Sequence, residues 1–126
     1  MCIFVYVAAD RPLDGIGETG MQIKPVKGRE RQLLPAEHVY LAFGNCACDL
    51  TLDGADESDK AKRDALLDQL ERFLTAATRT GPVYALATDG DRRTTPKKVT
   101  VTASEVRDFD FDSSWDAPTL LTITDG

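Results

Sequence analysis

The sequence predicts an α+β fold, a two-layer sandwich in which one main helix packs on a mixed sheet of four to five strands. Short runs of β-branched and aromatic residues recur along the chain, whereas a single segment, about residues 59-79, repeats apolar side chains at helical spacing. The strands lie before and after this helix instead of alternating with several helices, which is typical of α+β domains. The length of 126 residues suits one domain, and no change of composition divides the chain, so we expect a single α+β domain over residues 1-126.

Apolar runs predict the main strands. Residues 2–8 and 39–43 are almost continuously apolar and rich in β-branched and aromatic side chains, which indicates strands buried on both faces of the sheet. Later strands are expected at residues 83–88, 99–102 and 119–124. The connection over residues 10–37 is rich in Gly, Pro and charge. A connection of this length is uncommon in a compact domain, so it is a functional loop or contains a short strand near 21–26.

The helix at 59-79 has recognisable ends. Ser58 is a favourable N-cap, and the acidic residues around it lie near the positive end of the helix dipole. Gly81 and Pro82 follow the last turn and predict where the helix stops. The apolar face of the helix is formed by Leu66, Leu70, Phe73, Leu74 and Ala77.

Two further local patterns bear on the topology. The segment that runs from 39–43 through the helix to 83–88 fits a right-handed βαβ crossover, which would make these two strands parallel. Thr102 and Glu105 have the spacing of a capping box, in which each side chain bonds the backbone N–H of the other residue. We therefore expect a short helical turn to begin there.

Composition and charge restrict the class of protein. Apolar residues make up 42% of the chain and charged residues 29%, a balance that can build one core and argues against disorder. The net charge of −6 repels phosphate backbones, so nucleic acid is a poor candidate for a partner, while a basic protein or a small molecule stays open. No apolar run approaches the roughly 20 residues of a membrane span, which argues against a membrane protein.

The start of the chain and the cysteine count indicate a cellular location. The opening apolar run has no basic region before it, so it is expected to be a strand and not a secretory signal. This indicates a cytoplasmic, reducing location, in which structural disulfides are rare. The chain has 3 cysteines, an odd count that also argues against a full set of disulfides.

The three cysteines form the candidate site. Cys46 and Cys48 stand two residues apart after the strand at 39–43, and Cys2 begins the first strand. Thiolates are soft ligands that suit zinc or copper(I), so all three are candidate metal ligands, and thiol redox chemistry is a second interpretation. In an extended strand the Cβ atoms of Cys46 and Cys48 would lie roughly 6–7 Å apart, so a shared ion or a disulfide requires a turn at Ala47. A third interpretation places the cysteines in the core as small apolar side chains.

The direction of the first two strands decides which groups Cys2 can meet. His38, the only histidine, precedes the strand at 39–43, and Cys46 follows it. A regular strand would separate the two by roughly 26 Å, so they cannot share an ion. Antiparallel pairing of the first two strands would put Cys2 beside Gly44 and the Cys-x-Cys segment. Parallel pairing would put it beside His38, the only arrangement that keeps a Cys–His nucleophile for Cys2.

Other motifs have a weaker claim to function. Residues 15–20 match G-x-G-x-x-G, but no strand directly precedes them and no helix can follow, so a flexible loop explains them better than a dinucleotide site. The basic residues within 92–98 suit an anionic ligand or a solvated turn. Trp115 suits an interface anchor or a cover for the edge of the core. Glu37 and His38 are neighbours in a strand and point to opposite faces, which argues against an acid–base pair.

Three patches, MCIFVYVAADRPL, VYLAFGNCACDL and VYALATDGD, resemble a family of small uncharacterised bacterial proteins, over about the first 90 residues. That family opens with Met-Cys, an aromatic-rich strand and an Ala-[Ser/Ala]-Asp-x-Pro-Leu turn, and it carries a Gly-x-x-Cys-x-Cys-like segment after a second strand. Asn45 and Ala47 depart from the more polar or glycine residues expected there. The resemblance implies no activity, but it implies that Cys2, Cys46 and Cys48 belong to one motif.

Two hypotheses of function follow. The first is a small cytoplasmic protein whose clustered cysteines bind a soft metal ion or act as a thiol redox centre. The second is a non-catalytic acidic module for protein–protein interaction, an inhibitor or immunity-like protein with a basic partner. No set of residues names a reaction, so enzyme activity is neither predicted nor excluded.

Overall fold

The computed structural model describes residues 4–13, 23–26, 34, 36–42, 57–88, 97–109 and 118–125. Within these residues the chain forms six strands, one α-helix and two short 3-10 helices. The strands are β1 (Phe4–Ala9), β2 (Ile23–Pro25), β3 (His38–Ala42), β4 (Val83–Thr88), β5 (Lys97–Thr102) and β6 (Thr119–Thr124); the helices are α1 (Glu57–Ala77), η3 (Thr78–Thr80) and η4 (Ser104–Asp108). The α+β prediction is confirmed.

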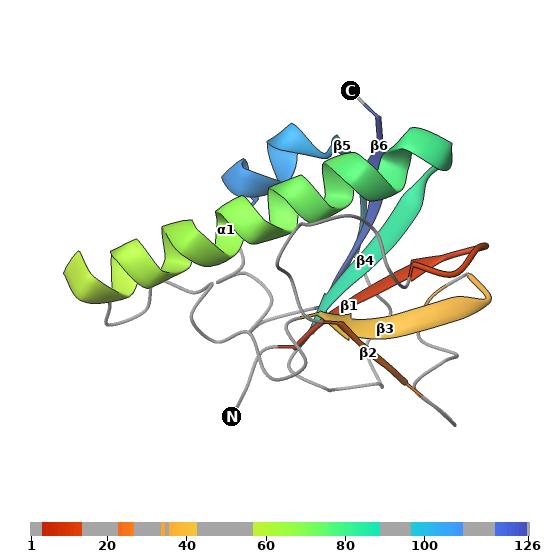
Figure 1. Cartoon of the computed structure of the whole chain (residues 1–126), viewed down its shortest axis with the longest axis horizontal. Coiled ribbons are helices and arrows are strands. Elements are labelled where there is room, and N and C mark those ends of the chain that lie inside the picture. The colour runs from red at the N-terminus through yellow and green to blue at the C-terminus, as the bar shows by residue number, and fades with distance from the viewer. Residues whose placement is uncertain are drawn as a thin grey trace.

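The strands form one mixed sheet, with the order β2-β3-β1-β4-β6-β5. Neighbouring strands pair antiparallel except β5 and β6, which are parallel. The sequence predicted four to five strands, and the described residues contain six because both weakly patterned segments, 21–26 and 99–102, lie in edge strands, β2 and β5. Figure 1 shows α1 lying across one face of this sheet.

The βαβ prediction is correct about the relative direction of the two strands, but these strands are not neighbours in the sheet. β3 and β4 both run antiparallel to β1, so they run the same way as each other. They do not pair, because β1 lies between them in the sheet. The unit is therefore a split strand–helix–strand arrangement in which the N-terminal strand fills the central place.

α1 begins two residues earlier than predicted. The helix starts at Glu57, so Ser58 lies in the first turn and is not the N-cap. At the other end, the 3-10 turn η3 continues the helix as far as Thr80, and Gly81 ends it as expected. Thr78 supports this junction because its buried hydroxyl donates to the carbonyl oxygen of Leu74 at 2.7 Å.

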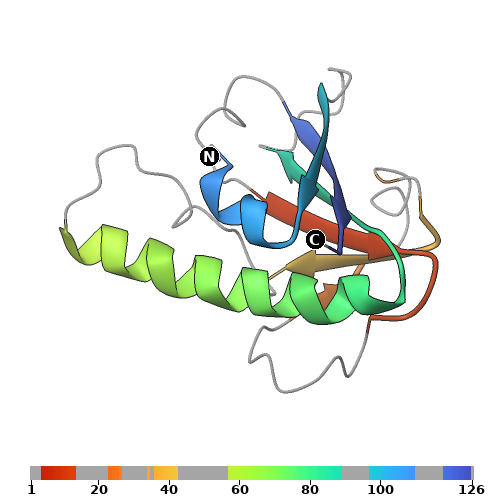
Figure 2. The same ribbon diagram turned by 90° about the horizontal axis from the view of Figure 1, so that it is seen from above.

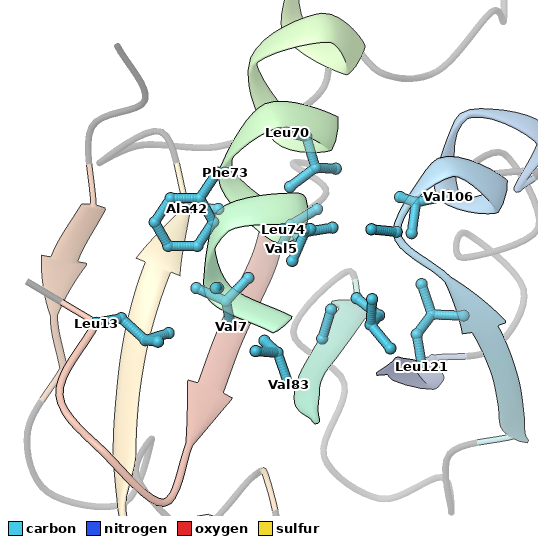
Figure 3. Packing of buried hydrophobic residues seen from close by; sticks show 14 of the residues in the cluster. Val5, Val7, Leu13, Ala42, Leu70, Phe73, Leu74, Val83, Val106 and Leu121 are labelled. Atoms are coloured by element: carbon cyan, nitrogen blue, oxygen red, sulfur yellow. The ribbon is translucent and has the colours of Figure 1, made fainter. Parts of the chain in front are cut away.

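The main core lies between α1 and the sheet (Figure 3). β1 contributes Val5, Val7 and Ala9 to this core, while Tyr6 and Ala8 belong to a second apolar cluster on the other face. Because successive side chains of a strand point to opposite faces, this alternation explains why β1 is apolar throughout, as predicted. From α1, the buried residues that complete the main core are Leu67, Leu70, Phe73, Leu74 and Ala77.

The helix η4 and the residue Leu13 complete the main core. η4 follows β5 and packs beside α1, as the view in Figure 2 shows, and its Val106 is buried in the core. Leu13, just beyond β1, is also fully buried. Its backbone N–H donates to the hydroxyl of Tyr40 at 3.2 Å, which joins the exit of β1 to β3.

Arg11 holds the C-terminal end of the helix. Its Nη2 donates to the carbonyl oxygens of Ala77 and, at 2.9 Å, Gly81, and its Nη1 donates to that of Pro82 at 3.4 Å. The last carbonyls of a helix have no partner within the helix, and they carry the negative end of its dipole. One guanidinium therefore satisfies these acceptors and joins the exit of β1 to the start of β4.

Gly81 has a backbone that only glycine adopts without strain. Its φ is 143° and its ψ is 175°. A Cβ atom at this position would lie 3.2 Å from Nη1 of Arg11. The sharp turn from helix to strand and the close approach of Arg11 thus both depend on this glycine.

We predict that Gly81→Ala lowers the free energy of unfolding by about 1–3 kcal/mol, because alanine is strained in this backbone region. Arg11→Met is expected to cost about 2 kcal/mol, since three carbonyl oxygens lose a charged donor. Urea denaturation measures both values. Arg79→Met, at an exposed site of η3, is the control and should change stability by less than about 0.5 kcal/mol; an equal effect of the two arginine substitutions would contradict the assignment.

The capping box at the end of β5 is confirmed. The backbone N–H of Thr102 donates to Oε1 of Glu105 at 2.9 Å, and the N–H of Glu105 donates to the hydroxyl of Thr102 at 3.4 Å. η4 begins at Ser104, between these two residues. The backbone N–H and then the hydroxyl of Thr102 lower the pKa of Glu105 below its ordinary value.

This lowered pKa predicts a pH dependence of stability. A carboxyl group whose pKa is lower in the folded state stabilises the fold above its ordinary pKa, about 4.3 for glutamate, and loses this effect as the pH falls through the folded-state value. Glu105→Gln keeps a hydrogen-bonding side chain but no charge. We expect the wild type to exceed this variant in stability at pH 7 and the difference to shrink towards pH 3 in urea denaturation. A difference that stays constant with pH would contradict the prediction.

Candidate functional site

The strand ladder fixes which chain ends lie together. β1 pairs antiparallel with β3, with Tyr6 opposite Leu41 and Ala9 opposite His38. The start of β1 and the end of β3 therefore lie at the same end of the sheet. Phe4 is also opposite Thr88, the last residue of β4, so β4 ends there too. We call this end, marked by Phe4, Ala42 and Thr88, the Phe4 end.

Three further strands begin at the Phe4 end, and the first of them is β2, whose first residue Ile23 is opposite Ala42. Ala87 is opposite Thr119, the first residue of β6, and Thr119 pairs with Lys97, the first residue of β5. All six strands in the described residues thus start or end at this side of the sheet. α1 has its C-terminus at the other end, because it leads into the start of β4.

The three candidate cysteines fall next to the Phe4 end in sequence. Cys2 precedes Phe4 by two residues, and Cys46 and Cys48 follow Ala42 by four and six residues. All three cysteines lie outside the residues that the structure describes, so no distance between their sulfur atoms is known. Their role as ligands of zinc or copper(I) stays a prediction.

His38 lies at the opposite end of the ladder. Its side chain is half-buried, and its partner in β1 is Ala9. Of the two strand directions, the antiparallel one is present, which is the arrangement that leads Cys2 towards Gly44 and the Cys-x-Cys segment. The interpretation that pairs Cys2 with His38 as a nucleophile required parallel strands and is wrong.

Within the described part of the chain no metal site is formed. No three His, Cys, Asp or Glu side chains there lie together in a way that would hold an ion. Glu37 is exposed and lies just before β3, and His38, the first residue of β3, is half-buried. Lys97 and Lys98 are exposed at the start of the edge strand β5. The remaining candidates, residues 15–20, Arg92, Arg93 and Trp115, lie outside the described residues.

The structure contains a charge network that the sequence did not predict. Nη1 of Arg107, in η4, donates to Oε2 of Glu71 at 2.9 Å and to a carboxylate oxygen of Asp68, both in α1. The hydrogen bond from Arg107 lowers the pKa of Asp68, with a smaller effect from the charge of Arg72. The same bonds raise the pKa of Arg107. No sequence pattern signals this network, because its members lie 36 and 39 residues apart.

A shallow hollow lies beside this network. It has a volume of about 540 Å³, and its walls come from one side of α1 and from η3. Its lining residues are Asp68, Glu71, Arg72, Thr75, Ala76 and Arg79. Arg107 pairs with both acidic residues and offsets one of their two negative charges, and the hollow also contains two further arginines, Arg72 and Arg79.

Comparisons with known proteins found no relative of this chain. No family model matches the chain, and no curated protein or solved structure matches it significantly. The resemblance to a family with an N-terminal Met-Cys strand therefore remains a prediction. In the part of the chain that the structure describes, no helix is both long and apolar enough to cross a membrane.

We predict that Arg107→Gln raises the pKa of Asp68 towards its ordinary value, because the largest contribution to its lowered pKa is lost. Arg72→Gln is the matched control, and it should produce a smaller rise since Arg72 acts only through its charge. Carboxyl carbon NMR titration of Asp68 measures both. Equal shifts in the two variants, or none with Arg107→Gln, would contradict the assigned cause.

Proposed function

We propose that this chain is a thiol protein whose Cys2, Cys46 and Cys48 act together at the Phe4 end of the sheet. The observation that supports the proposal is the antiparallel pairing of β1 with β3. This pairing gives the segments that carry the cysteines a common starting point, since one leads out of Phe4 and the other out of Ala42.

The register makes this argument quantitative. Tyr6 is opposite Leu41 and Ala9 opposite His38, so paired residue numbers add up to 47. Continued by the same rule, the ladder would put position 2 opposite position 45, next to Cys46. Cys2 lies within about 7 Å of Phe4 along an extended chain, and Cys46 within about 14 Å of Ala42. Both segments are short enough to meet at this end.

The chemistry of three thiolates suits a soft metal ion. They would supply three of the four ligands of tetrahedral zinc, or the full set of a three-coordinate copper(I). Thiolate–zinc distances are near 2.3 Å, so the chain would have to turn at Ala47 to bring Cys46 and Cys48 onto one ion. The same turn would be required for a disulfide between Cys46 and Cys48.

A second candidate function is a non-catalytic interaction module. The outward side of α1 is exposed along its whole length and carries closely spaced charged residues. Replacement of the cysteines separates the two candidates: the interaction module would keep its binding with serine at all three positions, and the thiol protein would not keep its metal or redox property.

The first experiment is elemental analysis with thiol titration on protein purified without chelator and under reducing conditions. We expect close to one equivalent of zinc or copper per chain, with the thiols protected until a chelator is added. Single replacements of Cys2, Cys46 or Cys48 by serine should each weaken metal binding at least about tenfold.

His38→Ala is the matched control. It removes the only imidazole, at the opposite end of the β1–β3 ladder, and should leave the metal content unchanged. Loss of metal in this variant would contradict a site at the Phe4 end. Metal-free protein whose three thiols react independently, and do not form a disulfide on mild oxidation, would reject the proposal.

A further inference from the structure

α1 and η3 carry an exposed stripe of side chains on the side away from the core. We call it the outer face of α1, and it consists of Glu57, Ala61, Asp64, Asp68, Arg72, Thr75 and Arg79. These residues follow one another at intervals of three and four, so they share one side of the helix. All seven are exposed, whereas the buried residues of α1 lie on the side that faces the sheet.

The charges on the outer face are arranged symmetrically about its centre. The N-terminal half is acidic, with Glu57 and Asp64, and the C-terminal half is basic, with Arg72 and Arg79. Relative to Asp68, Glu57 and Arg79 lie eleven residues away on either side, and Asp64 and Arg72 lie four residues away. The small residue Ala61 and Thr75 lie seven residues away. Each acidic residue thus has a basic counterpart at the same distance from the centre.

This arrangement fits a second copy of the same helix placed antiparallel. In a twofold pair centred on Asp68, residues whose numbers add up to 136 lie at the same level along the two helices. Glu57 would then lie opposite the partner's Arg79, and Asp64 opposite the partner's Arg72. By symmetry these contacts occur twice, so four ion pairs would form across one interface.

We propose that a second copy of this chain docks on the outer face of α1, as an antiparallel pair of helices. The symmetry of the charges about Asp68 favours this occupant. A different protein would only need charges of its own opposite to those of the outer face, so it would give no reason for that symmetry. The small side chain of Ala61 allows the helices to approach. The hollow of about 540 Å³ beside Arg72 and Arg79 leaves room for side chains of the partner.

The centre of the interface has one like-charge contact, which the structure offsets. Asp68 would face its own copy across the twofold axis, and two carboxylates there would repel each other. In each chain, however, Asp68 is paired with Arg107. Arg107, which Asp68 shares with Glu71, therefore offsets part of the charge of the central carboxylate from outside the interface stripe.

The interaction should be weak and sensitive to salt. Exposed ion pairs contribute little each, and they are screened as the ionic strength rises. The outer face also lacks large apolar side chains, which supply most of the affinity in tight interfaces. We therefore expect a dimer that is populated at high protein concentration and low salt, and that dissociates near 0.5 M salt.

The test is a charge swap followed by sedimentation equilibrium, with chelator and reductant present so that thiols do not contribute. Asp64→Arg and Arg72→Asp each turn the Asp64–Arg72 contact into a repulsion, twice per dimer, and should each weaken dimerisation about tenfold or more. An equimolar mixture of the two variants restores opposite charges and should dimerise like the wild type. The double variant with both substitutions should do so as well.

Lys62→Glu is the matched control. Lys62 is exposed on α1 outside the outer face, and the substitution changes the net charge by the same amount as Arg72→Asp. It should leave the dimer affinity within about threefold of the wild type. A wild type that stays monomeric at low salt, single variants that dimerise normally, or a double variant that fails to recover would each overturn the proposal.

Discussion

The central position of β1 is the constraint on which the rest of this structure depends. β1 pairs with β3 on one edge and with β4 on the other, so it is an interior strand of the sheet. Its side chains are buried on both faces, in the main core and in the second apolar cluster. Because β3 and β4 both run antiparallel to this strand, its direction alone decides which loops come together at each end. The start of β1 and the ends of β3 and β4 lie together at the Phe4 end for this reason.

The helix depends on β1 in a second way, through Arg11, which lies two residues beyond the end of the strand. Arg11 reaches three carbonyl oxygens at the junction of α1, η3 and β4. A helix end packed against protein needs such a donor, since its last carbonyl groups have no partner of their own. The turn itself requires Gly81, whose backbone brings the chain within reach of the guanidinium. One cation and one glycine therefore set where α1 stops and how it enters β4.

Local patterns predicted the elements well, and long-range contacts escaped prediction for a physical reason. The strands at 83–88 and 119–124 and the Thr102–Glu105 capping box match the structure, because each is encoded by neighbouring residues. Ser58 was a plausible cap in composition, yet the helix begins before it at Glu57. Arg11 and Arg107 act on groups 36 or more residues away, and no periodicity reports such a contact. Strand direction was equally open in the sequence, and only the register of β1 and β3 shows that the start of β1 lies beside the end of β3 and away from His38.

The two proposals concern different surfaces, and the topology relates them. α1 has 21 residues and spans about 31 Å, with its C-terminus at the His38 end and its N-terminus directed towards the Phe4 end. In an antiparallel pair of these helices, the Phe4 end of one chain would lie beside the His38 end of the other. The two sets of cysteines would then occupy opposite ends of the dimer, so each would bind its own ion without a ligand from the partner. A metal-dependent dimer would contradict this arrangement, whereas a salt-dependent dimer that forms with or without metal is what the geometry of α1 leads us to expect.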